Sequence, residues 1–385
     1  MTDTPPLSLY VHWPFCLAKC PYCDFNSHVR DDIPHRRFTT ALRQELAYDA
    51  ARTGRRRLRS IFFGGGTPSL MQPETVALLI EDARRLFDAD PDLEITLEAN
   101  PTSVEQAKLQ AFREAGVNRL SLGIQSLDER ALRFLGREHS APQAIAALET
   151  ARALFPRLSF DLIYARPDQS LADWESELRQ ALALASDHLS LYQLTIEQGT
   201  KFEALYRQGQ FALPEDDDAA RLYEKTAEIA ALFGMRDYEI SNYARPGAES
   251  RHNLTYWRYQ DYIGIGPGAH GRLTLNEGLL ATRRHRAPEI WAERVEQRGS
   301  GSTDECPLSP EERGREALLM GLRLREGISL DWFTARTGRE LRDCVNAVIL
   351  EAALEEGYLT LDRARLIATD EGRVRLEALL GALVL

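Results

Sequence analysis

The first two hundred residues alternate between short apolar runs and longer amphipathic stretches. Within 143–154, Ala144, Leu148, Ala151 and Leu154 recur at intervals of four and three, which marks one face of a helix. Strands that alternate with helices at this spacing predict βαβ units and a parallel sheet. The predicted strands are 8–13, 60–64, 93–99, 119–125, 158–164 and 188–194, and the helices between them are 36–51, 74–87, 104–115, 143–154 and 172–184.

About six such units favour an α/β protein with a partial (β/α)6 barrel over a doubly wound sheet, although the pattern alone fits both. After residue 200 the alternation loosens, and a Gly-Ser stretch at 299–302 marks a boundary. We therefore expect two domains, 1–300 and 301–385. The second has helical patterns at 311–322, 330–337 and 341–355, then β runs at 358–361 and 365–368 and a last helix, an order that predicts a winged-helix-like α+β domain.

Composition narrows the class of protein. With 44% hydrophobic and 27% charged residues, the 385-residue chain has the balance of a soluble globular protein. Its net charge of −11 argues against binding the phosphate backbone of nucleic acids. Residues 306–385 hold 14 acidic and 11 basic residues, so the small domain is not expected to read DNA. The longest apolar runs are too short for a membrane span, and residues 1–14 lack a signal-peptide pattern, so we expect a cytoplasmic protein.

The five cysteines are too few for a disulfide framework. Cys16, Cys20 and Cys23 form a C-x3-C-x2-C spacing just after the first predicted strand, while Cys306 and Cys344 stand alone. Three thiolates on one loop can converge on one metal centre, so the cluster is predicted to bind metal.

Two kinds of metal centre fit this spacing. A structural zinc ion would need a fourth ligand, which His28 could supply. The other reading is a [4Fe–4S] cluster held by three cysteines, whereas electron-transfer clusters commonly use four. A missing fourth cysteine would leave one iron open to a small molecule.

Polar residues follow the predicted strands at one end. Strand 60–64 runs into the Gly-Gly-Gly-Thr-Pro-Ser segment 64–69, and the next three strands carry Glu98, Gln125 and Asp161. Any one of them could be a turn or a cap. Because active sites of parallel α/β barrels lie at the carboxyl ends of the strands, their coincidence predicts a functional site there.

Together, the cysteine loop, segment 64–69 and the strand-end Glu, Gln and Asp resemble the radical S-adenosylmethionine (SAM) family. The branch most similar is that of oxygen-independent coproporphyrinogen III oxidase and its relatives, and the resemblance spans nearly the whole chain. It implies a [4Fe–4S] cluster whose open iron is chelated by the amino and carboxylate groups of SAM. In that family an electron from the cluster cleaves SAM to methionine and a 5′-deoxyadenosyl radical.

The resemblance also assigns residues. Cys16, Cys20 and Cys23 would hold the cluster, and Arg137 would pair with the SAM carboxylate. Glycines 65 and 66 would let the methionyl end approach the backbone. The implied SAM-binding set is Tyr10, Tyr22, Gly65, Gly66, Thr67, Glu98, Gln125, Arg137 and Asp161.

Two departures separate this chain from the oxidases. Phe25 stands where they carry a further cysteine, and only nine residues precede Tyr10, without their N-terminal extension. The family usually has Gly-Leu before the proline that corresponds to Pro167, whereas this chain has Ala165 and Arg166 there. Coproporphyrinogen oxidation is therefore not expected.

The segment 251–257 reads Arg-His-Asn-Leu-Thr-Tyr-Trp and resembles the HNxxYW haem-binding motif of HemW-type haem chaperones. Histidine offers a nitrogen to iron, and tyrosine and tryptophan offer flat faces to a porphyrin. His270 is a weaker candidate ligand. The residues that the resemblance assigns to haem are His252, Asn253, Tyr256 and Trp257.

A Gly-x-Gly-x-x-Ala pattern at 264–269 fits a dinucleotide fingerprint, but no βαβ unit follows it, so we read it as a turn lining the barrel mouth.

The resemblance implies a haem chaperone that delivers haem to acceptor haemoproteins and needs an electron donor for its cluster. A radical SAM enzyme of tetrapyrrole metabolism and a zinc-stabilised scaffold remain alternatives.

Overall fold

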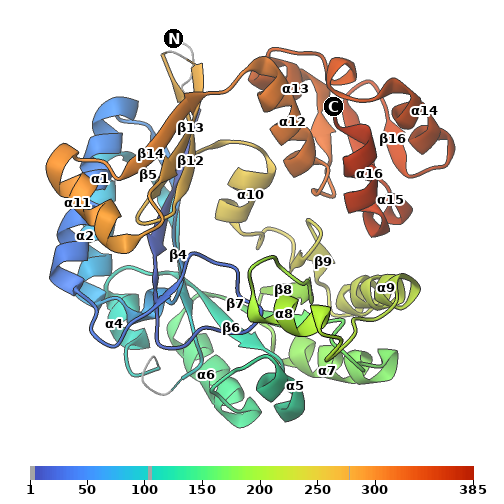
Figure 1. Ribbon diagram of the computed structural model, residues 1–385, viewed down its shortest axis with the longest axis horizontal. Helices are drawn as coiled ribbons and strands as arrows, with labels where there is room; N and C mark the ends of the chain where they lie inside the picture. The colour runs from blue at the N-terminus through green and yellow to red at the C-terminus, as the bar shows by residue number, and fades with distance from the viewer. Residues whose placement is uncertain (1–4, 103–105, 277) are drawn as a thin grey trace.

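In the computed structural model, residues 5–102, 106–276 and 278–385 are described, and one large sheet dominates them (Figure 1). Six strands of this sheet run parallel in chain order, and each overlaps one of the six predicted strands. The predicted strand pattern and the α/β class are therefore confirmed. These strands are β1 (Leu7–Trp13), β4 (Arg57–Gly65), β5 (Asp88–Ala99), β6 (Arg119–Gln125), β7 (Arg157–Tyr164) and β8 (His188–Gln193).

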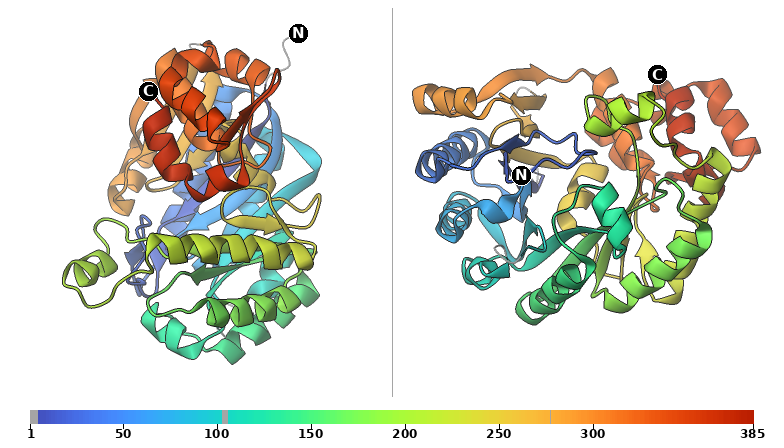
Figure 2. Two further views of the ribbon diagram at one scale, coloured as in Figure 1. Left: turned by 90° about the vertical axis from the view of Figure 1, so that its right-hand side faces the viewer. Right: turned by 60° about the horizontal axis from the view of Figure 1, so that its bottom comes forward.

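Helices follow the parallel strands and cover the outer face of the sheet in an arc (Figure 1; Figure 2). Ser140 and Ser170 cap two of them through reciprocal capping boxes. The predicted helix 104–115 begins on residues outside the described ranges. The helices are α1 (His35–Thr53), α2 (Pro73–Leu86), α4 (Leu109–Glu114), α5 (Glu129–Phe134), α6 (Ala141–Leu154), α7 (Leu171–Leu184), α8 (Lys201–Arg207) and α9 (Asp216–Leu232).

Strands that the hydrophobic pattern did not reveal extend the sheet at both ends. On one side, β11 (Asp261–Ile265) joins β1 in parallel and continues into antiparallel β12 (His270–Leu275), β13 (Gly278–Arg284) and β14 (Ser302–Pro307). On the other side, β10 (Asn242–Ala244) and β9 (Arg236–Asp237) follow β8. The sheet thus runs to Pro307, past the Gly-Ser stretch at 299–302.

Residues on the parallel strands alternate between two environments. On β1, Leu7, Leu9 and Val11 point outward and are buried under the helices, whereas Ser8 and Tyr10 point into the half-barrel. The inward positions of the other strands are also largely polar. They include Ser60, Thr96, Glu98, Arg119, Ser121, Ser159, Asp161, His188 and Ser190.

A short helix fills this polar interior. Helix α10 (Arg251–Trp257) lies across the inner face of β1 and β4, in the middle of the molecule (Figure 1). Thr255 hydrogen bonds to Ser8 at 2.8 Å, and the backbone N–H of His252 donates to Glu94 at 3.2 Å. The helix therefore satisfies buried groups that would otherwise be unpaired.

The C-terminal unit has the predicted order of helices and hairpin, with β15 (Ile328–Ser329) added to its sheet. The predicted helix 341–355 is split, because the Asn346 side chain accepts hydrogen bonds from two backbone amides and starts a new helix. The remaining elements are α12 (Pro310–Gly321), α13 (Leu330–Thr337), η2 (Leu341–Cys344), α14 (Ala347–Glu355), β16 (Leu359–Leu361), β17 (Arg365–Ala368), α15 (Asp370–Val374) and α16 (Leu376–Leu383).

This unit holds both sides of the open barrel. Arg325 and Arg373 pair with Asp237 of β9 at 2.7 and 2.9 Å. Glu316 of α12 pairs with Arg272 of β12 at 2.7 Å. The C-terminal unit therefore links two strands that lie far apart in the sheet.

Among the described residues, no helix has the length and apolarity of a membrane span.

The glycines of segment 264–269 let three strands meet closely. A Cβ atom on Gly264 would lie 1.9 Å from the His270 carbonyl oxygen, and one on Gly266 would lie 2.3 Å from that of His12. Segment 264–269 is thus a tight turn at the mouth of the barrel, and Gly268 and Ala269 line the cavity described below.

We predict that Gly264→Ala lowers the free energy of unfolding by about 1–3 kcal/mol, because the new methyl group must displace backbone. Gly381→Ala is the matched control, since a Cβ there meets nothing within 4 Å and alanine favours the helix. Urea denaturation of both variants measures the difference. Equal stabilities would contradict the tight turn.

Candidate functional site

The cysteine loop connects β1 to α1 and folds back on itself. Cys16 lies in β2 (Phe15–Cys16), which pairs with β3 (His28–Val29). The Cys23 amide donates to the Cys20 carbonyl at 3.2 Å, and the Arg30 amide donates to the Cys16 carbonyl at 3.1 Å. These bonds bring the three cysteines onto one short loop at the carboxyl end of the strands.

Hydrogen-bond donors approach the sulfur atoms. The Thr67 hydroxyl lies 3.4 Å from Cys16 Sγ, and Arg137 Nη1 lies 3.2 Å from Cys20 Sγ. Burial raises the pKa of Cys16 and of Cys23, and coordination to a metal ion would favour the deprotonated form of both thiols. A Cβ on Gly66 would lie 3.0 Å from Cys16 Sγ. The donor set fits a metal centre bound by three thiolates.

His28, the candidate fourth ligand of a zinc ion, lies in β3 next to the cysteine loop. In the described part of the chain, no three His, Cys, Asp or Glu side chains gather closely enough to hold a single ion. The His28 ring lies near Arg286. Burial lowers the pKa of His28, and a hydrogen bond to the backbone of Arg286 partly opposes this lowering.

A cavity of about 460 Å³ opens beside this loop. Of the predicted SAM residues, Tyr10, Gly65 and Glu98 line it. Burial, and then the charge of Asp161, raises the pKa of Glu98 to about 8, while burial raises that of Asp161 to about 6. Glu98 and Asp161 lie on β5 and β7, the two strands that flank β6. The charge of buried Arg119 on β6 lowers both pKa values and so partly opposes the effect of burial.

The amides of segment 64–69 are used inside the protein. The Gly66 amide donates to the Trp13 carbonyl at 2.7 Å, and the Thr67 amide donates to the Phe15 carbonyl at 2.8 Å. The Gly65 amide donates to Glu98 at 3.3 Å. A ligand at this segment would therefore meet carbonyl oxygens and the Thr67 hydroxyl.

Arg137 links the cysteine loop to the ends of β5 and β6. Its Nη2 donates to Asn100 at 2.5 Å and to the Gly123 carbonyl at 2.7 Å. Its Nε is buried with no hydrogen-bond partner among the described residues, which leaves one donor for an anionic ligand. Tyr22 lies beside Arg137 and raises its pKa, and Gln125 ends β6 with a left-handed φ of 71°.

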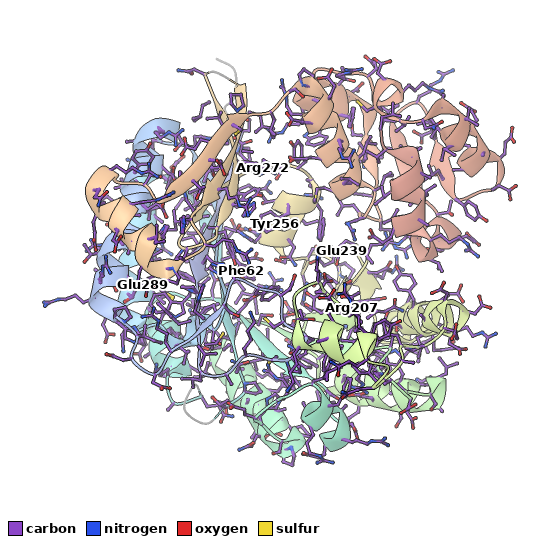
Figure 3. The ribbon with its side chains drawn as sticks, in the orientation of Figure 1. Phe62, Arg207, Glu239, Tyr256, Arg272 and Glu289 are labelled. Carbon is purple, nitrogen blue, oxygen red and sulfur yellow. The ribbon has the colours of Figure 1, made fainter. Side chains whose placement is uncertain are left out.

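The HNxxYW segment coincides with α10, and His252 points into the barrel. Its Nδ1 lies 2.9 Å from the Ser60 hydroxyl, and its Nε2 lies 2.8 Å from the Tyr256 hydroxyl. The ring stacks on Phe62 at 4.9 Å, and burial lowers its pKa to about 3. In this arrangement neither nitrogen is available to iron. His252 instead holds Tyr256, which lines the cavity. Figure 3 labels Tyr256 on this helix in the middle of the molecule.

The other two members of the segment lie outside the cavity wall. Asn253 is 3.5 Å from the Tyr238 hydroxyl. Trp257 lies under Arg323 of the C-terminal unit at 5.6 Å, and its Nε1 has no partner among the described residues. Of the four residues assigned to haem, only Tyr256 lines the cavity.

Arg166 has a structural role. It pairs with Glu177 at 2.5 Å and donates to the Ser126 hydroxyl at 2.6 Å, both buried. The ion pair neutralises the positive charge, so this departure from the family pattern leaves no unpaired charge near the site.

The sequence interpretation missed several residues at the cavity. These are His12, Asn26, Tyr262, Arg283 and Arg286. The alternation of polar and apolar residues in β1 could have revealed His12, because it lies on the same side as Ser8 and Tyr10. No sequence pattern could have revealed Arg283 and Arg286, since they come from a hairpin at the far end of the sheet.

Comparisons with known proteins identify the family to which this chain is similar. The family model described as Radical SAM superfamily matches residues 10–181, and that described as HemN C-terminal domain matches residues 308–375. The chain is 39% identical over 383 residues to heme chaperone HemW of Escherichia coli (strain K12), covering 99% of this chain and 98% of that protein. It is 42% identical over 388 residues to radical S-adenosyl methionine domain-containing protein 1, mitochondrial, of Bos taurus, covering 98% and 87%.

A solved structure extends the comparison to the fold. Coproporphyrinogen III oxidase HemN from Escherichia coli aligns with a TM-score of 0.80 at 22% identity, covering 98% of this chain and 90% of that one. At this identity the likeness shows the fold alone.

The raised pKa of Glu98 predicts a pH-dependent stability. The folded protein holds this proton more tightly than the unfolded chain, so the stabilisation is present below pH 4.5 and is lost as the pH rises through about 8. Glu98→Gln should therefore gain stability relative to the wild type between those values. Denaturation across pH 4.5–8 measures this, with Glu224→Gln on α9 as an exposed control. Parallel curves for wild type and Glu98→Gln would contradict the assignment.

Proposed function

Because this chain belongs to the HemW family of radical SAM proteins, we propose that it is a haem chaperone that binds haem and delivers it to acceptor haemoproteins. The supporting observation is the cavity beside the cysteine loop, which combines aromatic rings with cationic side chains. Such a lining suits a flat, anionic macrocycle better than a small polar metabolite.

The proposal includes a [4Fe–4S] cluster and SAM. When bound, the cluster offers an open iron to SAM and an electron from a separate donor protein. Cys16, Cys20 and Cys23 would hold it, with Thr67 and Arg137 donating to the sulfur atoms. The unpartnered Nε of Arg137 would meet the SAM carboxylate.

The carboxyl groups of Glu98 and Asp161 would accept hydrogen bonds from the hydroxyl and amino groups of SAM. Tyr10 lines the same cavity, and Tyr22 lies beside Arg137. All five cysteines are free thiols in the structure, which suits a compartment that keeps thiols reduced, such as the cytoplasm.

Phe25 favours the chaperone over an oxidase of tetrapyrroles. Its side chain is 56% exposed and lines the cavity, at the position where the oxidases carry a further cysteine. An exposed aromatic ring at a cavity mouth gains free energy when a flat ligand covers it. A radical SAM tetrapyrrole enzyme is the second candidate, because the Radical SAM and HemN C-terminal family models both match this chain.

We predict that anaerobic reconstitution loads an iron–sulfur cluster that depends on three cysteines. Cys16→Ala, Cys20→Ala and Cys23→Ala should each lose the iron, the acid-labile sulfide and the visible absorbance. Cys306→Ala and Cys344→Ala are the matched controls, since both residues lie outside the loop. Zinc without sulfide in the wild type would support the scaffold alternative.

We also predict that the reconstituted protein takes up ferric haem stoichiometrically and transfers it to an apo-cytochrome of the b type. Absorbance spectroscopy follows both steps. SAM-dependent consumption of coproporphyrinogen in the same preparation would support the oxidase candidate, and a wild type that takes up no haem would exclude the chaperone.

A further inference from the structure

Three side chains at the mouth of the cavity lack partners. His270 is exposed on β12, and Arg283 lies directly opposite it on β13. Arg286 follows two residues after β13 ends, and all three line the cavity. No described residue forms a hydrogen bond or ion pair with these side chains, whereas Arg272 of the same hairpin makes a bidentate pair with Glu316.

Unpaired arginines are unexpected on an acidic protein. The chain has a net charge of −11, and many of its other arginines pair with carboxylates. Two neighbouring guanidinium groups that face one cavity therefore form a ready site for carboxylates, which the planar guanidinium binds in bidentate fashion.

Two further histidines, His12 on the cavity wall and His252 behind Tyr256, are engaged at both ring nitrogens. His12 Nδ1 lies 3.0 Å from the Tyr10 hydroxyl, and its Nε2 lies 2.9 Å from the Asn26 carbonyl. Both nitrogens of His252 have partners as well. At this cavity His270 is thus the imidazole among the described residues with both nitrogens open to a ligand.

Aromatic rings form the wall between these polar groups. Phe25 comes from the cysteine loop, Tyr256 from α10 and Tyr262 from β11, with Tyr256 and Tyr262 in edge contact at 4.6 Å. Asn26 Nδ2 donates to the carbonyls of Pro267 and Arg286 at 2.9 Å each, which fixes the loop against the hairpin. The wall is therefore held in place by the same contacts that position Arg286.

We propose, on the basis of the proposed haem-binding function, that haem docks at this mouth with His270 as its iron ligand and Arg283 and Arg286 binding its two carboxylates. Phe25 and Tyr256 contact the macrocycle. Histidine is a common axial ligand of haem iron, and a porphyrin that carries carboxylates on one edge matches the two arginines. The assignment makes His252 a positioning residue that acts through Tyr256.

The test titrates the cluster-loaded, full-length protein with ferric haem, with metal-free protoporphyrin IX and with haem dimethyl ester. His270→Ala should weaken haem binding at least about tenfold and shift the Soret band, while binding of the metal-free porphyrin stays unchanged. Added imidazole should restore the Soret band, because it replaces the lost ligand.

Arg283→Gln with Arg286→Gln should weaken haem binding roughly tenfold, yet leave binding of the dimethyl ester unchanged, since the ester lacks both charges. The matched control, Arg179→Gln with Arg207→Gln, removes the same charge from exposed helix pairs.

The outcomes separate this inference from the proposed function. A wild type that binds no haem overturns both. A wild type that binds haem while His270→Ala keeps its affinity and Soret band overturns the ligand assignment alone. If His252→Ala loses the ferric haem spectrum but still binds the metal-free porphyrin, the iron ligand would be His252 of the HNxxYW segment.

Discussion

The polar inner face of the half-barrel is the constraint on which the rest of the structure depends. Side chains such as Ser8 and Ser60 line an interior that the outer helices do not cover, and a buried polar group is stable only when it is hydrogen bonded. Helix α10 supplies those partners from a segment about two hundred residues further along the chain. His252 is therefore as buried as a core residue although it carries an imidazole.

The buried inner face also shifts the pKa values of two carboxyl groups at the candidate site. Burial raises the pKa values of Glu98 and Asp161, and the charge of Arg119 partly opposes this rise. Hydrogen bonds also hold the cysteine loop in place. His12 bonds to the backbone carbonyl of Asn26, and the Asn26 side chain donates to the carbonyl of Pro267 in the turn 264–269. The cavity wall and the cysteine loop are thus connected by hydrogen bonds.

The C-terminal unit contributes to this site without lining it. It pairs with β9 and with β12, strands that stand near opposite ends of the open sheet. Holding β12 also holds the hairpin that carries His270 and Arg283. The C-terminal unit therefore helps to position the cavity mouth through β12.

The sequence was sufficient for the parallel strands, for most of their helices and for the cysteine loop, because these follow from local periodicity and spacing. It also assigned Glu98 and Asp161 to the parallel strands, and the structure has Glu98 at the end of β5 and Asp161 within β7. The strands β9 to β14 escaped prediction because they are short or of mixed polarity, and their pairing is set by distant neighbours. Which histidine is free was likewise decided only by tertiary structure. The partner of His252 Nδ1 lies 192 residues away at Ser60, and no local pattern can show that this imidazole is occupied while that of His270 is open.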